Sequence, residues 1–314
     1  MQKLRIVFAG TPAVAVPSLD RLATSGHDLV GVVTRKPAPL GRKRVLTPSP
    51  VAEAAARLGV PLIEANRLDA DATARIGALE PDLGVIVAYG GLVREPLLST
   101  PVHGWINLHF SLLPAWRGAA PVQHSLIAGD AVAGASVFQL VPELDAGDVY
   151  AELRHPLQGD ETAGALLDEL AVSGGALLAE VVEAIADGSA RAVPQTGAPS
   201  LAPKLSIDDA RLDWSRPADE VRARFRGVTP EPGAWTTIDE QRVKLLDLGA
   251  PADGDAVAAG PPLAPGELGF SARRVLIGTG TTPLELRRVQ PAGKPAMDAG
   301  DWWRGSGRTT AVAR

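Results

Sequence analysis

The chain has 314 residues, of which 46% are hydrophobic and 21% are charged, the balance of an ordinary globular protein and not of a disordered one. It contains no cysteine, which excludes a disulfide scaffold, thiolate metal ligands, an iron–sulfur cluster and a cysteine nucleophile. The histidines include no close pair, so we expect no metal site. Because the net charge is −5, nucleic-acid binding would need a local basic patch.

The first residues resemble a signal peptide but are better interpreted as a buried strand. Lys3 and Arg5 precede an apolar run, yet this run, residues 6–9, is shorter than the ~7–15 residues of the apolar core of a signal peptide, and Gly10 follows at once. The longest uncharged stretch, 96–116, contains prolines and polar residues that do not suit a membrane span. We therefore expect a cytoplasmic protein without a membrane segment.

Short apolar segments alternate with segments of helical spacing through the first part of the chain. The predicted strands are 4–9, 29–34, 62–64, 83–88 and 105–110, and the predicted helices among them are 18–25, 51–58 and 69–79. A strand pair, 134–141 with 148–154, and a long helix, 161–186, follow. This order predicts an α/β fold with an open, mostly parallel Rossmann-like sheet and helices on both faces.

The composition of the sequence changes after this helix. Residues 192–203 place prolines among small residues, which indicates a linker. The strands predicted beyond Asp208 are short and separated by Gly and Pro: 233–238, 243–248, 267–277 and 284–289, with a surface loop at 251–265. We therefore expect a Rossmann-like domain at 1–190, a linker at 191–207, and a small OB-like β-barrel at 208–314.

Polar residues on the fifth predicted strand are candidates for catalysis. Asn107 and His109 lie two positions apart, so their side chains share one face of the strand. An amide beside an imidazole can hold a carbonyl oxygen that becomes an oxyanion, or the two residues can simply satisfy each other in a core. Asp145, on a predicted turn, can bring a carboxylate to His109, whereas Asp148 is interpreted as a turn residue.

The neighbouring loops suit a flat heteroaromatic ligand. Ser111, Leu112, Leu113 and Pro114 begin an irregular loop, and Ala88, Tyr89 and Gly90 end another strand with an edge that can admit a ring. A nucleotide cofactor is disfavoured, because the loop at Gly10 lacks the later glycines of a dinucleotide fingerprint.

Two clusters of basic residues stand out in this acidic chain. Half of the residues in 35–44 are Lys or Arg and none is acidic, which fits either a solvated loop or a contact with a phosphate backbone. Arg222, Arg224 and Arg226 form the second cluster. Their alternating spacing would place them on one face of a strand, most simply a solvated one.

Several motifs together resemble the methionyl-tRNA formyltransferase family. They are FAGTP at 8–12, LTPSPV at 46–51, NLHFSLLPAWRGAAPVQ at 107–123, LDAGD at 144–148, KLS at 204–206, DWSRPA at 213–218, PGAWT at 232–236 and VQPAG at 289–293. The part from Asn107 to Gly118 marks the wider folate-dependent formyltransferase superfamily. The continuation to Gln123 and the C-terminal motifs are more specific.

The resemblance implies transfer of a formyl group from 10-formyltetrahydrofolate to the α-amino group of methionine on initiator tRNA. By motif match the catalytic residues are Asn107, His109 and Asp145, with a protonated His109 expected beside the developing oxyanion. The expected folate-binding residues are Ser111, Leu112, Leu113, Pro114, Ala88, Tyr89 and Gly90, and the expected tRNA-binding residues are Arg42, Lys43 and Arg44. The barrel is expected to be a second tRNA contact.

The expected partners are therefore charged initiator tRNA and folate, with no metal, no membrane and no obligatory protein partner, so that the chain acts as a monomer. This chain departs from the family at Phe110, where a small residue is usual, and within 35–44. The alternative is a formyltransferase for a nucleotide-linked amino sugar, which shares the fold and the site but has no need of the basic loop. A purine-pathway formyltransferase would lack the second domain, and a non-catalytic RNA-binding module would not need the Asn107, His109 and Asp145 set.

Overall fold

The computed structural model describes residues 3–41, 43–251, 263–271 and 273–314, and their contacts divide the chain into two units. The first unit comprises Met1–Pro121, Val132–Pro156 and Leu166–Pro203, and the second comprises Val122–Ala131, Leu157–Ala165 and Lys204–Arg314. The boundary between Pro203 and Lys204 falls inside the segment, 191–207, that the sequence predicts as a linker. Two short segments of the N-terminal part, by contrast, group with the second unit.

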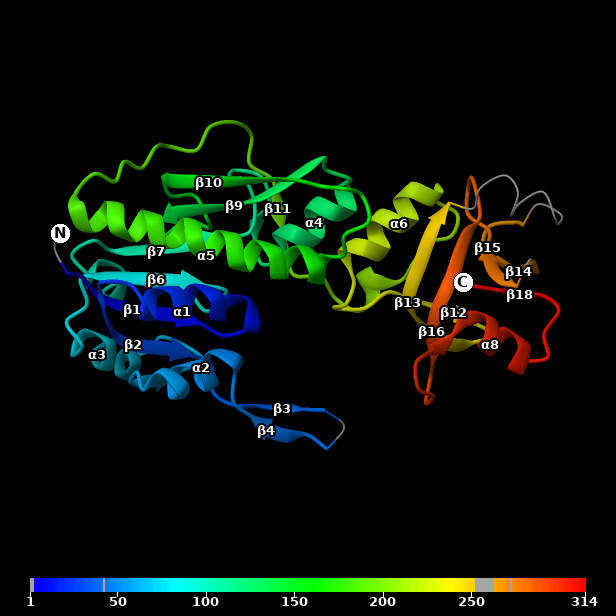
Figure 1. Cartoon of the computed structure of the whole chain (residues 1–314), viewed down its shortest axis with the longest axis horizontal. Coiled ribbons are helices and arrows are strands. Elements are labelled where there is room, and N and C mark those ends of the chain that lie inside the picture. The colour runs from blue at the N-terminus through cyan, green and yellow to red at the C-terminus, as the bar shows by residue number, and fades with distance from the viewer. Residues whose placement is uncertain (1–2, 42, 252–262, 272) are drawn as a thin grey trace. The chain divides into compact units, whose positions relative to one another are not determined.

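The first unit is built on one sheet with strand order β10-β9-β7-β6-β1-β2-β5 (Figure 1). Its strands are β1 (Arg5–Gly10), β2 (Asp28–Thr34), β5 (Leu62–Glu64), β6 (Leu83–Val87), β7 (Trp105–His109), β9 (Val132–Gln139) and β10 (Val149–Pro156). The strands from β7 to β5 in this order are parallel, whereas β9 is antiparallel to β7 and β10 is antiparallel to β9. The predicted mostly parallel sheet is confirmed.

Helices cover both faces of this sheet. They are α1 (Val16–Ala23), α2 (Pro50–Leu58), α3 (Ala70–Gly77) and α5 (Ala163–Asp187). On one face α5 packs closely, because a Cβ added at Gly174 would lie 3.2 Å from Leu108 of β7. On the other face Ile76 of α3 belongs to a buried cluster with Val7 and Trp105. The apolar strands are thus shielded on both sides, as their sequence predicts.

Polar side chains cap the first turns of two of these helices. The Ser49 hydroxyl accepts a hydrogen bond from the Ala52 amide at 3.0 Å, and Pro50 opens α2. The Asp69 carboxylate likewise accepts from the Ala72 amide at 3.0 Å at the start of α3. Such caps satisfy amide groups that have no partner within the helix. They therefore fix the residues at which α2 and α3 begin, and with them the connections that lead into these helices.

The basic segment is a β-hairpin and not an irregular loop. Strands β3 (Ala38–Leu40) and β4 (Val45–Thr47) pair antiparallel, and the Arg44 amide donates to the Gly41 carbonyl at 3.1 Å to close the turn. The hairpin extends away from the sheet of the first unit in Figure 1. Its apolar residues are exposed, including Leu40 and Leu46, each at 67%. Apolar and polar residues do not alternate along these two strands, because neither face of the hairpin packs on a core.

In the second unit, antiparallel strands follow the order β12-β13-β16-β15-β14-β18. They are β12 (Trp235–Ile238), β13 (Gln241–Pro251), β14 (Glu267–Ser271), β15 (Arg274–Ile277), β16 (Leu284–Pro291) and β18 (Ala311–Val312), with β17 (Met297–Asp298) beside β16. The end strands meet, because Thr237 and Arg314 exchange backbone hydrogen bonds of 3.0 and 2.8 Å and Ile238 bridges Ala313. The sheet therefore closes into the predicted β-barrel.

One predicted barrel strand, 267–277, is in fact two. Strands β14 and β15 pair antiparallel, with Ser271 opposite Arg274. The turn between them contains no Gly, Pro, Asn or Asp to mark it, and Arg273 instead adopts a positive φ of 65°. Most of the predicted surface loop at 251–265 lies outside the described residues.

The predicted strand face of Arg222, Arg224 and Arg226 is wrong, because these residues lie on helix α6 (Ala218–Gly227). Val221 and Phe225 are buried at a spacing of one helical turn, and acidic residues fill the first turn. A helix directs the three arginines differently: Arg224 donates to the Asp209 carbonyl at 2.9 Å, whereas desolvation by burial lowers the pKa of Arg226. The remaining α-helices among the described residues are the short segments α4 (Pro121–Ala128) and α8 (Ala299–Gly305).

Candidate active site

Strand β7 carries Asn107 and His109 toward the edge of the sheet at which the parallel strands end. In register, Asn107 lies between Ile86 of β6 and Phe138 of β9, and His109 lies opposite Ser136 of β9. His109 is buried at 6% exposure, and Asn107 is half-buried. Open α/β sheets bind ligands at this edge. The pair predicted from the sequence therefore stands where a substrate can reach it.

The two ring nitrogens of His109 have different surroundings. Nε2 lies 2.9 Å from the Trp116 carbonyl oxygen, which can only accept, so Nε2 carries the hydrogen and donates. Nδ1 faces the Asp145 carboxylate, with Oδ2 at 3.8 Å. The Phe138 ring meets the imidazole edge-on at a centroid distance of 6.3 Å. His109 is thus fixed in orientation, with Nδ1 turned toward a carboxylate.

Burial sets the charge of His109. Desolvation lowers its pKa below the ordinary value of 6.5, and the opposing influences of Asp145 and the Trp116 carbonyl are smaller. The imidazole of the free protein is therefore neutral at neutral pH. This differs from the protonated His109 expected from the motif match, because the motif places a carboxylate near the imidazole but does not show how deeply His109 is buried.

Asp145 is held in place by its neighbours. Its Oδ2 accepts a hydrogen bond from the Gly118 amide at 2.7 Å, and its side chain is 12% exposed. Gly118 belongs to β8 (Arg117–Gly118), which pairs with β11 (Leu201–Ala202). Asp148, in contrast, is exposed. The structure thus brings Asp145 and not Asp148 to His109, as the sequence predicts.

The side-chain amide of Asn107 makes no hydrogen bond with any described residue. The backbone of Asn107, in contrast, is paired with both neighbouring strands. A half-buried amide left without a partner is costly unless water or a ligand pairs with it. Its donors are therefore available to an oxygen atom bound beside His109.

The segment that contains Ser111, Leu112, Leu113 and Pro114 turns its polar groups inward. The Ser111 hydroxyl donates to the Ala115 carbonyl at 2.6 Å, and the Ser136 hydroxyl bridges the Ser111 carbonyl, at 2.7 Å, and the Leu113 amide, at 3.2 Å. Leu113 packs in a small cluster with Phe138 and Val149. Ser136, which no sequence motif indicates, thus fixes the segment next to His109.

The second expected folate-binding segment ends strand β6. Ala88 and Gly90 are exposed and adopt positive φ angles of 49° and 76°. Tyr89 between them is buried at 1% exposure, and its hydroxyl donates to the Ala65 carbonyl at 2.6 Å. Only the small residues of this segment therefore face solvent.

Arg35, at the base of the hairpin, is bound to this segment. Its Nε donates to the Tyr89 carbonyl at 3.3 Å, and its Nη2 donates to the Gly90 carbonyl. The Thr11 hydroxyl donates to the same Tyr89 carbonyl at 3.1 Å. The turn after β6 is thus held from two sides, by the loop after β1 and by the residue that leads into the hairpin.

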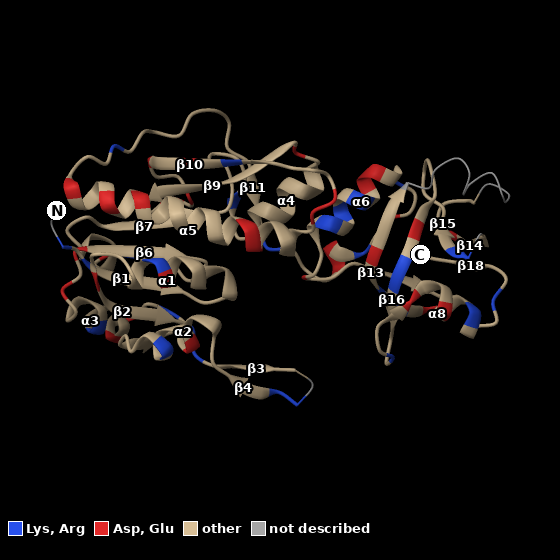
Figure 2. Cartoon of the chain, viewed as in Figure 1, with Lys and Arg blue, Asp and Glu red and all other residues tan. Residues whose placement is uncertain are grey.

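Basic side chains occupy the tip of the hairpin. Figure 2 shows Lys and Arg there, and Lys43 and Arg44 are exposed. Arg42, the third expected tRNA-binding residue, lies outside the described residues. Neither Lys43 nor Arg44 forms an ion pair with a described residue, so both charges are available to a partner.

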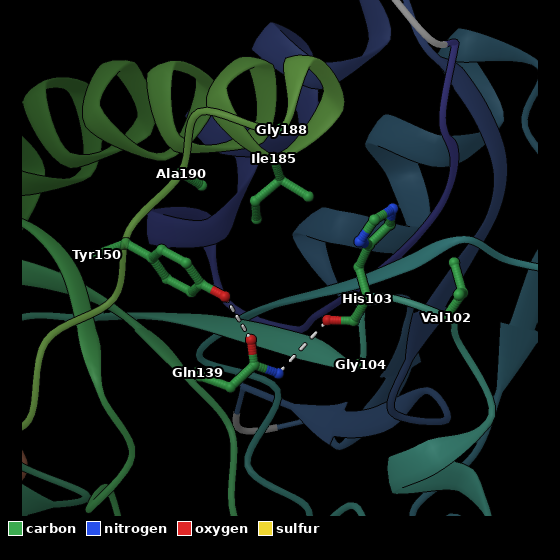
Figure 3. Close-up of a pocket in the computed structure, with 8 residues that line it drawn as sticks. All are labelled: Val102, His103, Gly104, Gln139, Tyr150, Ile185, Gly188 and Ala190. Carbon is green, nitrogen blue, oxygen red and sulfur yellow. Dashed lines mark hydrogen bonds between the residues drawn. The ribbon is translucent and has the colours of Figure 1, made fainter.

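A cavity of about 510 Å³ lies at the opposite edge of the sheet, next to Gly104 before β7 (Figure 3). Two of its polar side chains bond within the protein: the Tyr150 hydroxyl donates to Gln139 Oε1 at 2.7 Å, and Gln139 Nε2 donates to the Trp105 carbonyl at 3.0 Å. The edge with His109 is therefore the better candidate site.

Among the described residues, no group of acidic residues and histidines is placed to hold a metal ion. No helix in the described part of the chain is long and apolar enough to cross a membrane.

Known folds resemble this one. A sugar 3N-formyl transferase, WlaRD, has a TM-score of 0.67 at 13% identity, covering 94% of this chain and 100% of its own. HypX from Aquifex aeolicus, solved with tetrahydrofolic acid, has a TM-score of 0.63 at 16% identity, over 96% of this chain and 47% of its own. At such identities the likeness concerns the fold.

Sequence comparison is more specific. A family model described as formyl transferase matches residues 3–182, and one described as formyl transferase, C-terminal domain matches 204–307. The methionyl-tRNA formyltransferase of Leifsonia xyli subsp. xyli is 62% identical over 304 residues, which are 97% of this chain and 98% of that protein. The methionyl-tRNA formyltransferase of Clavibacter sepedonicus is 60% identical over 311 residues, which are 99% and 100% of the two chains. The chain therefore belongs to the formyltransferase family, in its methionyl-tRNA formyltransferase branch.

Proposed function

We propose that this chain transfers the formyl group of 10-formyltetrahydrofolate to the α-amino group of methionyl initiator tRNA, which yields the formylated tRNA for translation initiation. One observation carries the proposal. A buried His109 lies between the Trp116 carbonyl and the Asp145 carboxylate, beside the Asn107 side-chain amide, which has no hydrogen-bond partner among the described residues. Near-full-length identity of 60–62% to named methionyl-tRNA formyltransferases supports the substrate.

In the proposed reaction the methionyl amine attacks the formyl carbon, a carbon–nitrogen bond forms, and the formyl oxygen becomes an oxyanion. The Asn107 amide donates a hydrogen bond to this oxygen. His109, neutral at the start, accepts at Nδ1 the proton that the amine must lose. When the bond from the carbon to the folate nitrogen breaks, that nitrogen takes the proton from His109. The imidazole then returns to its starting state.

Asp145 stabilises the imidazolium that forms during this transfer. At 3.8 Å, and with little solvent between, its carboxylate attracts the cation more strongly than it would in water. Before the proton arrives, burial keeps His109 neutral and able to accept. Burial therefore favours the neutral imidazole that accepts the proton, and Asp145 lowers the free energy of the imidazolium that results.

The folate is proposed to bind along the edge formed by the segments 111–114 and 88–90. Ser111, Leu112, Leu113 and Pro114 contribute mainly backbone groups and the walls of the site. Ala88 and Gly90 leave room for a flat ring, and Tyr89 supports them from the core. Backbone groups at strand ends can bind the donors and acceptors of a heteroaromatic ring.

The tRNA is proposed to bind the tip of the hairpin through Arg42, Lys43 and Arg44, since clustered cations attract a phosphate backbone whatever the net charge. We further propose a catalytic domain at 1–190, a linker at 191–207 and a tRNA-contacting barrel at 208–314. The enzyme is proposed to act in the cytoplasm as a monomer, without a metal ion.

Incubation with 10-formyltetrahydrofolate and charged initiator tRNA tests the proposal, with mass-spectrometric identification of the acylated amino acid. We expect N-formylmethionine from the wild type and a strongly reduced amount from Asn107→Ala. Formylation of a nucleotide-linked amino sugar but not of the tRNA would support the alternative function. That alternative lacks a reason for the basic hairpin, and the sugar formyltransferase WlaRD is only 13% identical to this chain.

A further inference from the structure

Gln195 joins the two segments that hold Asp145. It lies in the extended segment after α5, and its amide nitrogen donates to the carbonyl oxygens of Asp145 and Gly147, each at 2.8 Å. Its amide oxygen accepts from Nε and Nη2 of Arg117, at 3.2 and 2.6 Å. Arg117 precedes Gly118, whose amide donates to the Asp145 carboxylate. One side chain therefore links the backbone of Asp145 to the strand that binds its carboxylate.

Only one orientation of the Gln195 amide satisfies these partners. The nitrogen meets two carbonyl oxygens, which can only accept, and the oxygen meets a guanidinium, which can only donate. Rotating the amide by half a turn would set donor against donor and acceptor against acceptor. The contacts thus use both N–H groups and the oxygen of this side chain.

Gln195 holds the backbone of Asp145 and Gly147, and any shift of this backbone would also move the Asp145 carboxylate. Asp145 adopts a positive φ of 46°, a left-handed conformation that is uncommon outside glycine, asparagine and aspartate. A Cβ on Gly147 would lie 1.8 Å from the Gln139 carbonyl oxygen, so the chain passes close to β9 there. The position of the Asp145 carboxylate relative to His109 therefore depends on how the backbone of Asp145 is fixed.

Anchoring of the segment after α5 does not require Gln195. Val193 and Val149 exchange backbone hydrogen bonds of 2.9 and 2.8 Å on one side of it. On the other side Ser200 accepts from the Arg117 amide at 2.9 Å through its carbonyl and from the Trp116 amide at 2.9 Å through its hydroxyl. The path of the segment is thus set without the Gln195 side chain, whose contacts instead converge on Asp145.

We infer that Gln195 is a positioning residue for formyl transfer, which acts through Asp145 by fixing that carboxylate against His109. The inference rests on the proposed function for its kinetic consequences. Gln195→Ala removes both donors and the acceptor. Gln195→Glu keeps an acceptor for Arg117 but sets a carboxylate oxygen against the two carbonyl oxygens. Both variants are expected to lower kcat by about tenfold to a hundredfold, since small displacements of reacting groups have effects of this size.

A double-mutant cycle separates positioning from general stabilisation. If Gln195 acts through Asp145, Gln195→Ala in an Asp145→Asn background should change kcat by less than about twofold, because coupled residues are not additive. The KM for 10-formyltetrahydrofolate should stay within about twofold in the single variant. Thr196→Ala is the matched control, because this exposed neighbour makes no hydrogen bond with a described residue. It should retain wild-type kcat.

A second readout does not depend on the reaction. NMR titration of His109, assigned with a His109→Gln variant, should give a lower imidazole pKa in Gln195→Ala than in the wild type, as in Asp145→Asn. An unchanged titration together with an undiminished loss of kcat in the Asp145→Asn background would overturn the inference. Absence of methionyl-tRNA formylation by the wild type would overturn the proposed function instead, and the titration would still decide the role of Gln195.

Discussion

The Nδ1 atom of His109 lies 3.8 Å from the Oδ2 atom of Asp145, and the two side chains are only 7% and 12% exposed. This distance is too long for a hydrogen bond but short enough for a strong charge interaction in a site with little water. The pair is therefore weakly engaged while the imidazole is neutral. It becomes strongly attractive once the imidazole gains a proton.

The first prediction concerns pH. Because burial lowers the pKa of His109, kcat/KM should rise with pH through a value below 6.5 and reach a plateau near neutrality. Asp145 is the group that raises this pKa, so Asp145→Asn should move the acid limb to lower pH and also lower the plateau. Steady-state rates measured from acid to neutral pH check both signs. An acid limb that moves to higher pH would contradict the assignment.

Asp148→Asn is the matched control for that variant. Asp148 carries the same charge and lies close by in the chain, but it is exposed and does not contact His109. Its replacement should leave kcat and the pH profile nearly unchanged. If it proves more damaging than Asp145→Asn, the roles of the two aspartates are reversed.

The second prediction concerns the oxyanion. Asn107→Ala removes an amide donor that has no partner among the described residues, and loss of such a donor commonly lowers kcat by about 10²–10³. His109→Ala removes the proposed proton acceptor, and a loss of similar size is expected. Single-turnover rates with saturating folate and tRNA measure the chemical step, and circular dichroism confirms the fold. Near-wild-type rates in both folded variants would exclude this site.

The third prediction concerns the tip of the hairpin. Replacing Arg42, Lys43 and Arg44 by alanine should weaken tRNA binding and flatten its salt dependence, by roughly 0.7–0.9 in the log–log slope for each phosphate that is no longer neutralised. Arg75→Ala on α3 removes a cation away from the hairpin and should leave the slope unchanged. Filter-binding titrations from low to moderate salt give the slopes. Equal slopes for wild type and triple variant would show that the hairpin does not touch RNA.

The fourth prediction separates the base of the hairpin from its tip. Arg35 donates to the carbonyl oxygens of Tyr89 and Gly90, so Arg35→Ala should loosen the turn beside the proposed folate site. We expect the KM for 10-formyltetrahydrofolate to rise more than the KM for tRNA, whereas the alanine variant of Lys43 should show the opposite order. Steady-state kinetics with each substrate varied in turn test this contrast.

Sequence patterns predict those parts of the fold that local packing decides. Buried runs predict the parallel strands, and Ser49 and Asp69 mark two helix starts by their own hydrogen bonds. The alternate spacing of the three arginines of α6 wrongly predicts a strand. The helix is indicated instead by Val221 and Phe225, which are buried and lie one turn apart. Gln195 has no local signal at all, since its partners lie 48–78 positions away. Long-range contacts of this kind exist only in the folded chain.

The closed barrel has a consequence for association between molecules. The outermost strand of an open sheet presents free backbone N–H and C=O groups, to which a strand of another molecule can add. Here the backbone of Arg314 occupies those groups at Thr237, and β18 occupies the edge of β14. A chain shortened before Ala311 would uncover both edges at once. Its expected fate is aggregation by strand addition, even though every residue near His109 would still be in place.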